Sequence, residues 1–98
     1  MGLQALVEVT LEPQTAENMA RFQAAAVADV AVQACWRTAS GPDFVLLLGV
    51  PDMAGYQTVA QRLFTGGLCV RNVRTFFATE RAKFLPGVPV QGSARGPA

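Results

Sequence analysis

The sequence has no histidine among its 98 residues. This absence excludes a histidine general base, a Ser-His-Asp triad and metal coordination through imidazole. Its two cysteines, Cys35 and Cys69, lie far apart and outside any C-x-x-C spacing, and two thiolates are too few for a metal site. A disulfide between them is conceivable, but isolated thiols with apolar neighbours are more typical of the reducing cytosol. We therefore expect no metal, no cofactor and a cytoplasmic location.

Long apolar runs and an excess of charge of one sign are also missing. The longest apolar run, residues 44–51, is far shorter than the roughly 20 residues of a membrane span. Glu8 and Glu12 interrupt the N-terminal region too early for a signal peptide. The 8 basic and 7 acidic residues give a formal net charge of +1, whereas a dedicated nucleic-acid binder has a basic excess. Because 51% of the residues are hydrophobic, the sequence predicts one soluble folded domain that neither enters membranes nor binds DNA directly.

The first half of the chain alternates between strand and helix patterns. Residues 3–12 alternate apolar and polar side chains, which predicts a half-buried strand. Thr15 is the expected N-cap of an amphipathic helix over residues 16–29. Residues 30–38 then alternate again and predict a second strand, whose shared face carries Val30, Val32, Ala34 and Trp36.

The second half repeats this order after a turn at residues 40–43. Residues 44–50 are continuously apolar, which predicts a strand buried on both faces. Asp52 is the expected N-cap of the next helix, since apolar residues follow at i, i+3, i+4, i+7 and i+8: Tyr56, Val59, Ala60, Leu63 and Phe64. Residues 70–84, rich in β-branched and aromatic side chains, predict a long last strand.

The resulting order, β-α-β-β-α-β, predicts a ferredoxin-like α+β fold with a four-stranded antiparallel sheet and two helices on one face. We place the domain at residues 1–90 and a disordered tail at residues 91–98, where Gly, Pro, Ser and Ala predominate. The last two strands carry apolar side chains on both faces, so a single copy would leave apolar surface in water. The pattern therefore predicts at least a dimer.

Few residues of the sequence are candidates for catalysis or ligand binding. Among seven scattered carboxylates, only Asp43 lies in a turn-rich loop, where a capping role and a functional role are equally plausible. The arginines of the last strand could form a basic stripe, although solvated edge-strand charges explain them better. Trp36 and Tyr56 are expected in the core or an interface. No catalytic residue is predicted, and an enzyme is disfavoured.

Several motifs resemble the effector-binding (RAM) domain of the Lrp/AsnC (feast/famine) regulator family. Residues 51–56 (PDMAGY) after a buried strand are similar to its V-P-D-x-x-x-Y helix entry. Residues 70–77 (VRNVRTFF) with the later Lys83 are similar to its last strand, and the Asp43-Phe44 pair also fits. The likeness extends over residues 5–84. It implies a dimeric α/β barrel built by sheets that pair face to face, with dimers that close into tetramers or octamers.

The resemblance also implies an amino acid effector bound between dimers, with five candidate ligand residues: Ser40, Gly41, Asp43, Arg74 and Thr75. Backbone N–H groups of the loop suit an α-carboxylate, and Asp43 or Thr75 suits an ammonium group. Arg74 and Thr75 should point to opposite faces of the strand, which favours Thr75. Two departures from the family pattern stand out, since Ser40-Gly41-Pro42 displaces the usual loop glycine and Val73 replaces a threonine.

Family regulators carry a helix-turn-helix domain before the first strand, and this chain begins at that strand. We therefore expect a stand-alone or excised effector-binding domain that regulates transcription indirectly or as part of a longer regulator. Two alternatives remain: a purely structural partner that co-assembles with full-length paralogues, and a small dimeric ferredoxin-like enzyme of the monooxygenase type.

Overall fold

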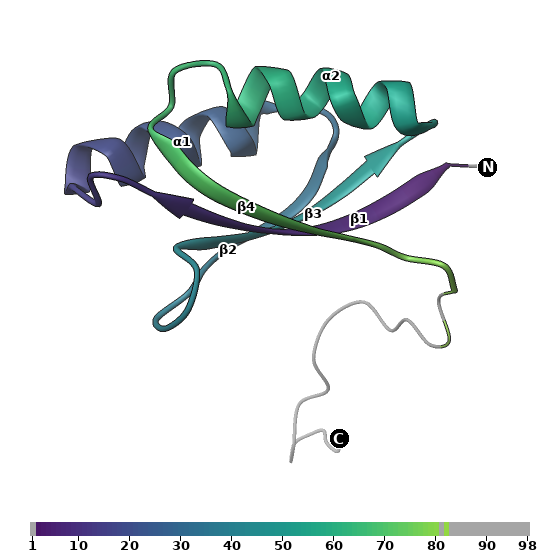
Figure 1. Cartoon of the computed structure of the whole chain (residues 1–98), viewed down its shortest axis with the longest axis horizontal. Coiled ribbons are helices and arrows are strands. Elements are labelled where there is room, and N and C mark those ends of the chain that lie inside the picture. The colour runs from purple at the N-terminus through teal and green to yellow at the C-terminus, as the bar shows by residue number, and fades with distance from the viewer. Residues whose placement is uncertain (1, 81, 83–98) are drawn as a thin grey trace, which may run out of the picture.

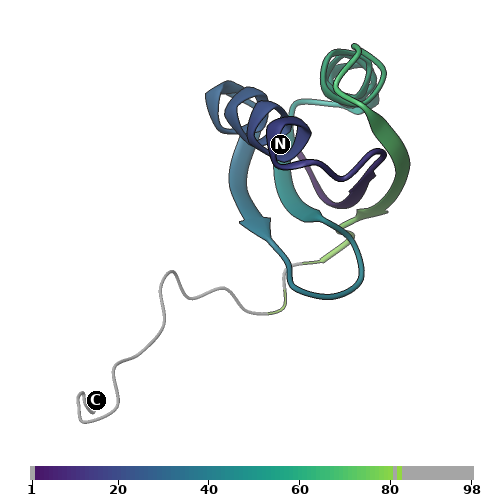
Figure 2. The same cartoon turned by 90° about the vertical axis from the view of Figure 1, so that its left-hand side faces the viewer.

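The computed structural model describes residues 2–80 and 82. Their order of elements is the predicted β-α-β-β-α-β, with these bounds: β1 Leu3–Leu11, α1 Ala16–Ala28, β2 Val32–Arg37, β3 Phe44–Val50, α2 Met53–Phe64 and β4 Val70–Phe77. The strands form one sheet in the order β2-β3-β1-β4, and each neighbouring pair is antiparallel. Both helices cover the same face of this sheet and leave the other face open (Figure 1; Figure 2).

The core lies between the helices and the covered face of the two central strands. Alternate residues of β1 and β3 point into it and are almost fully buried: Ala5, Val7, Val9, Leu11, Phe44, Leu46, Leu48 and Val50. Phe22 of α1 packs against Phe44 of β3, with ring centroids 5.0 Å apart. Val59 and Leu63 of α2 belong to the same buried cluster. Burying a side chain of this size contributes about 1.5–3 kcal/mol, so this layer is the main source of stability.

Both helices begin at the predicted N-caps. The Thr15 hydroxyl accepts a hydrogen bond from the N–H of Asn18 at 3.1 Å, and the Asp52 carboxylate accepts one from the N–H of Gly55 at 2.8 Å. The helices are also joined to each other. Asp29, at the C-terminal end of α1, accepts two hydrogen bonds from the Arg62 guanidinium on α2, at 2.7 and 2.8 Å.

The second strand differs from the alternation predicted for it. Val30 lies before β2 and is 98% exposed. The register between β2 and β3 shifts between Val32 and Ala34, so that Val32 pairs with Leu48 on the helix-covered face while Ala34 and Trp36 lie on the open face. The single-face prediction for these residues was wrong because a bulge adds one residue to β2 and inverts the alternation.

The last strand is shorter than predicted. It ends at Phe77, and the N–H of Ala78 donates to the Gln4 carbonyl near the start of β1 at 2.9 Å. The strand cannot extend much beyond this point because β1, its only neighbour in the sheet, begins at Leu3. Residues 83 and 84, and the predicted tail at residues 91–98, lie outside the described residues.

The third strand is buried fully on one face only. Val45 and Leu47, on the open face, are half-buried in this single chain. The prediction of a strand buried on both faces is therefore wrong for one copy, because no other layer of the described residues covers this side of the sheet.

Candidate functional site

The loop between β2 and β3 carries three of the predicted ligand residues. Ser40 and Gly41 are exposed at its tip, and Gly41 has φ +81°, a conformation that glycine adopts without strain. The loop is closed by hydrogen bonds across its base, from the Thr38 N–H to the Asp43 carbonyl at 3.1 Å and from the Thr38 hydroxyl to the Pro42 carbonyl. The tip of the loop is therefore exposed to solvent, while hydrogen bonds hold its two ends together.

Asp43 forms hydrogen bonds that connect this loop to the end of β1. One carboxylate oxygen, Oδ2, accepts hydrogen bonds from the Leu11 N–H at 2.8 Å and from the Gln14 side-chain amide at 3.1 Å. The Asp43 N–H in turn donates to the Val9 carbonyl at 2.9 Å. Asp43 therefore joins two distant parts of the chain and does not cap its own turn, and both of these side-chain bonds fall on a single oxygen.

Arg74 and Thr75 point to opposite faces of β4, as the strand alternation predicts. Thr75 pairs with Val7 on the helix-covered face, whereas Arg74 pairs with Glu8 on the open face. The Arg74 guanidinium lies 4.0 Å from the Glu8 carboxylate and 5.1 Å from the centroid of the Phe76 ring. Within one chain these two candidates cannot contact the same ligand.

Thr75 lines a groove of about 470 Å³ between α2 and β4. Its hydroxyl and that of Tyr56 are 2.6 Å apart and share a hydrogen bond. Tyr56 also packs edge-on against Phe77, with ring centroids 5.0 Å apart. The groove combines this polar pair with apolar side chains and with Arg71 and Asn72 of β4, which is an arrangement suited to orienting a small ligand.

The structure does not bring the loop and this groove together in one copy. The strand β1 lies between β3 and β4, and neither Ser40, Gly41 nor Asp43 lines the groove that contains Thr75. A single ligand could contact both regions only if they came from different subunits, as the predicted location between dimers requires.

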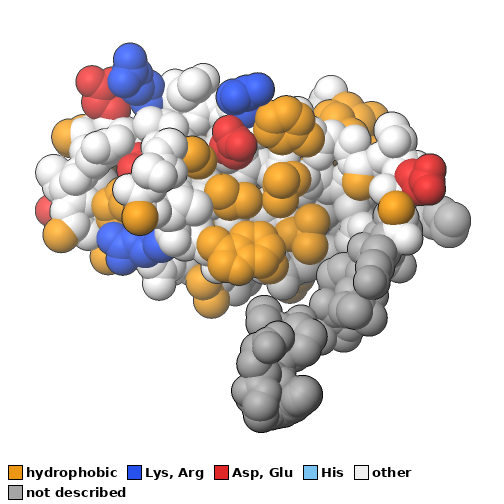
Figure 3. Space-filling model, turned by 90° about the horizontal axis from the view of Figure 1, so that it is seen from below, with side chains coloured by type: hydrophobic (Ala, Val, Ile, Leu, Met, Phe, Trp, Pro, Cys, Tyr) orange, Lys and Arg blue, Asp and Glu red, His pale blue; other side chains and the backbone are white. Residues whose placement is uncertain are grey.

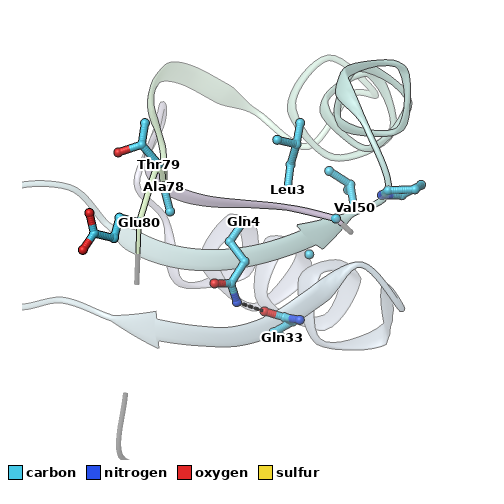
Figure 4. Close-up of a pocket in the computed structure, with 10 residues that line it drawn as sticks. Leu3, Gln4, Gln33, Val50, Ala78, Thr79 and Glu80 are labelled. Atoms are coloured by element: carbon cyan, nitrogen blue, oxygen red, sulfur yellow. Dashed lines mark hydrogen bonds between the residues drawn. The ribbon is translucent and has the colours of Figure 1, made fainter. Parts of the chain in front are cut away.

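A second hollow, of about 580 Å³, lies at the other end of the sheet (Figure 4). Here the Gln4 amide donates to the Gln33 side-chain oxygen at 3.1 Å across β3. Gly49 makes this possible, because a Cβ at that position would lie 2.5 Å from the Gln33 side-chain nitrogen. None of these residues was a candidate from the sequence.

Apolar side chains gather on the open face of the sheet (Figure 3), where the strand register aligns side chains in two adjacent rows. In the order of the strands, one row is Trp36, Val45, Glu8 and Arg74, and the next is Ala34, Leu47, Leu6 and Phe76. We call the six apolar members of these rows the open-face patch. Trp36 is 51% exposed, Phe76 45% and Leu6 39%. Apolar groups thus run from one edge of the sheet to the other, which is typical of a surface that another protein layer covers.

Within the described part of the chain, no three carboxylate or thiol groups come together in a way that could hold a metal ion. Cys35 and Cys69 are both free thiols, and burial raises the pKa of Cys35. Among residues 2–80 and 82, no helix is both long and apolar enough to span a membrane.

The sequence profile of the family described as the Lrp/AsnC ligand binding domain matches residues 4–88. The chain belongs to this family. The resemblance seen in the helix entry at residues 51–56 and in β4 is thereby confirmed.

Several transcriptional regulators are similar to this chain in sequence or in fold. The Bkd operon transcriptional regulator of Pseudomonas aeruginosa is 27% identical over 89 residues, which cover 91% of this chain and 58% of the regulator. A solved AsnC family regulator from Agrobacterium tumefaciens has the same fold, with a TM-score of 0.83, 22% identity, and coverage of 95% of this chain and 60% of that one. A Neisseria meningitidis regulator solved in complex with L-Met has a TM-score of 0.79 and 18% identity over 89% of this chain and 56% of its own. The Lrp/AsnC domain described here thus spans about three fifths of the length of these relatives.

The side chains that form hydrogen bonds with the candidate residues were not predicted from the sequence. Tyr56 was expected in the core or an interface, yet it shares a hydrogen bond with Thr75. A signal was present, because Tyr56 lies on the apolar stripe of its helix and Thr75 has the strand parity of Val73, so both must face the same interior. Gln14, which donates to Asp43, gave no comparable signal.

Proposed function

We propose that this chain is an amino-acid-responsive regulatory domain that acts as a homodimer or a larger even-numbered assembly and has no enzymatic activity. The observation that carries the proposal is the Lrp/AsnC ligand binding domain match over residues 4–88. The L-Met complex of the Neisseria meningitidis regulator supports an amino acid as the class of ligand. In this proposal the chain takes part in transcriptional control, either with full-length paralogues or within a longer regulator, and does not itself bind DNA.

The ligand would lie between copies, with Ser40, Gly41 and Asp43 from one and Thr75 from another. Exposed N–H groups at the tip of the loop suit the ligand carboxylate, and the Oδ1 oxygen of Asp43 is the oxygen best placed to accept from its ammonium group. Arg74 stays a weaker candidate because it lies on the other face of β4. A cytoplasmic location accords with two free thiols, which are usual in a reducing compartment.

A thermal-shift screen of the amino acids tests the ligand class. A compound that binds only the folded state raises the apparent stability by RT ln(1 + [L]/Kd), so a ligand at 100 times its Kd adds about 2.7 kcal/mol. We expect at least one amino acid to raise the melting temperature in a concentration-dependent way. A flat response to every amino acid would contradict the ligand part of the proposal.

Dimerisation through the open-face patch is tested by sedimentation at micromolar concentration. The wild type should sediment as a dimer or a multiple of it, and Leu47→Asp should shift it towards monomer, because a carboxylate in the middle of this patch would be buried without a partner. Glu17→Lys on the exposed surface of α1 is the matched control and should leave the assembly unchanged. A monomeric wild type would contradict this part of the proposal.

A further inference from the structure

Glu8 and Arg74 continue one row of the open-face patch as far as the edge of the sheet, where they are its two charged members. Glu8 lies on β1, one of the two inner strands, with Leu6 beside it along the strand and Val45 beside it on β3, whereas Arg74 lies on the edge strand β4. The Glu8 side chain is 31% exposed, and that of Arg74 is 67% exposed. The two charged groups therefore directly adjoin the apolar side chains that the proposed dimer would cover.

A second ion pair joins β4 to the residue after β1, but it is more exposed to solvent. Arg71 lies 3.3 Å from Glu12, and these side chains are 66% and 67% exposed. It is the closer of the two pairs, yet both members stay largely in water. Glu8 is about two thirds buried, and its 4.0 Å separation from Arg74 is the longer of the two, so this pair is the looser one and Arg74 keeps most of its surface available to a facing molecule.

We propose that Glu8 and Arg74 determine which partner the open face accepts, selecting a second copy of this chain over a face that lacks both charges. This inference rests on the proposed face-to-face dimer. A carboxylate and a guanidinium that become covered must be compensated, and a wholly apolar facing surface would leave both without new polar contacts. A second copy brings one charge of each sign to the interface, so four charges can compensate one another.

The same arrangement makes like charges costly. Glu8→Arg gives a face with two positive groups, and Arg74→Glu gives a face with two negative groups. Each variant alone would place like charges against each other in its own dimer, whereas a mixture of the two would place opposite charges together. Selection by charge therefore predicts a specific pattern of pairing and not merely a weaker dimer.

The test measures dimer dissociation constants by sedimentation for the full chain, with circular dichroism to verify folding. We expect Glu8→Arg and Arg74→Glu each to self-associate about a hundredfold more weakly than wild type, since an uncompensated buried charge has a cost of this order. An equimolar mixture of differently tagged variants should recover tight pairing, predominantly as the mixed dimer in native mass spectrometry. Glu12→Arg and Arg71→Glu are the matched controls and should self-associate as wild type does.

The outcomes separate this inference from the proposal on which it rests. If the wild type is dimeric and the Glu8 and Arg74 variants dimerise equally well, the charge selection is overturned while the dimer stands. If the mixture fails to form mixed dimers, the selection is likewise overturned. If a reversed charge unfolds the chain, Glu8→Gln replaces it, and unchanged self-association of that variant counts against the inference. A monomeric wild type removes the dimer itself.

Discussion

Asp43 and Thr75 each make hydrogen bonds within the chain that a ligand would have to share. Losing a hydrogen bond to a charged ligand group costs about 1.5–3 kcal/mol, which corresponds to roughly ten- to a hundredfold in affinity. Thr75→Ala and Asp43→Ala should each weaken amino acid binding by this order while the assembly persists. Calorimetric titration of each variant measures the loss. Unchanged affinity in Thr75→Ala would show that the groove residue is not a ligand contact.

The two variants should differ in stability, which gives the experiment an internal control. Asp43→Ala leaves the Leu11 N–H without its acceptor and detaches the loop from β1, so it should also lower the melting temperature. Tyr56→Phe removes only the hydroxyl that faces Thr75 and should leave the affinity closer to wild type than Thr75→Ala does.

The candidate residues themselves could be predicted from local sequence motifs. Their partners did not, because Leu11 and Gln14 are 32 and 29 residues away from Asp43 in the chain.

At the scale of elements, strand and helix patterns were enough to predict the order, the caps and the two faces of β4. The bulge in β2 was not predictable, because alternation between Val32 and Trp36 looks regular until pairing with β3 shows the extra residue. The residue at which β4 ends could not be predicted from the sequence either. Its sequence continues to favour a strand, but its length is limited by the start of β1, which lies at the other end of the chain.

The contact between α1 and α2 gives a prediction of pH-dependent stability. Hydrogen bonds from Arg62 hold the pKa of the Asp29 carboxyl below its usual value, against the opposing effect of burial. A lowered pKa in the folded state means that this stabilisation is present above the unfolded value of about 3.9 and is lost as pH falls through the folded value. Asp29→Ala should therefore destabilise the chain most near neutral pH, and the difference from wild type should shrink below about pH 4.

The size of this effect follows from the Asp29 contacts. The carboxylate also accepts from the Ala31 N–H at 3.0 Å, and loss of that bond alone should cost about 1 kcal/mol. Denaturant unfolding at a series of pH values measures the difference. Glu12→Ala, which removes an exposed carboxylate, is the control and should change the free energy of unfolding by less than about 0.5 kcal/mol. A difference for Asp29→Ala that does not vary with pH would contradict this account of the contact.

At the scale of the whole molecule, two features of the single copy bear on the proposed assembly. Among residues 2–80 and 82, nothing covers the apolar face of its sheet, and β1 separates β4 from β3 and the candidate loop before it. The sequence predicted the first of these, since apolar residues on both sides of β3 and β4 can be seen without a structure. The second depends on the strand order β2-β3-β1-β4, which places the loop before β3 away from β4.

The central claim is that this Lrp/AsnC domain binds an amino acid, and isothermal titration calorimetry of the wild-type chain tests it most directly. Each amino acid is titrated at millimolar concentration into the assembled protein. The account predicts saturable binding of at least one of them, with a stoichiometry of no more than one per chain and a clear loss of affinity in Thr75→Ala. No binding heat from any amino acid at these concentrations would contradict the claim and leave a purely structural role in co-assembly as the better explanation.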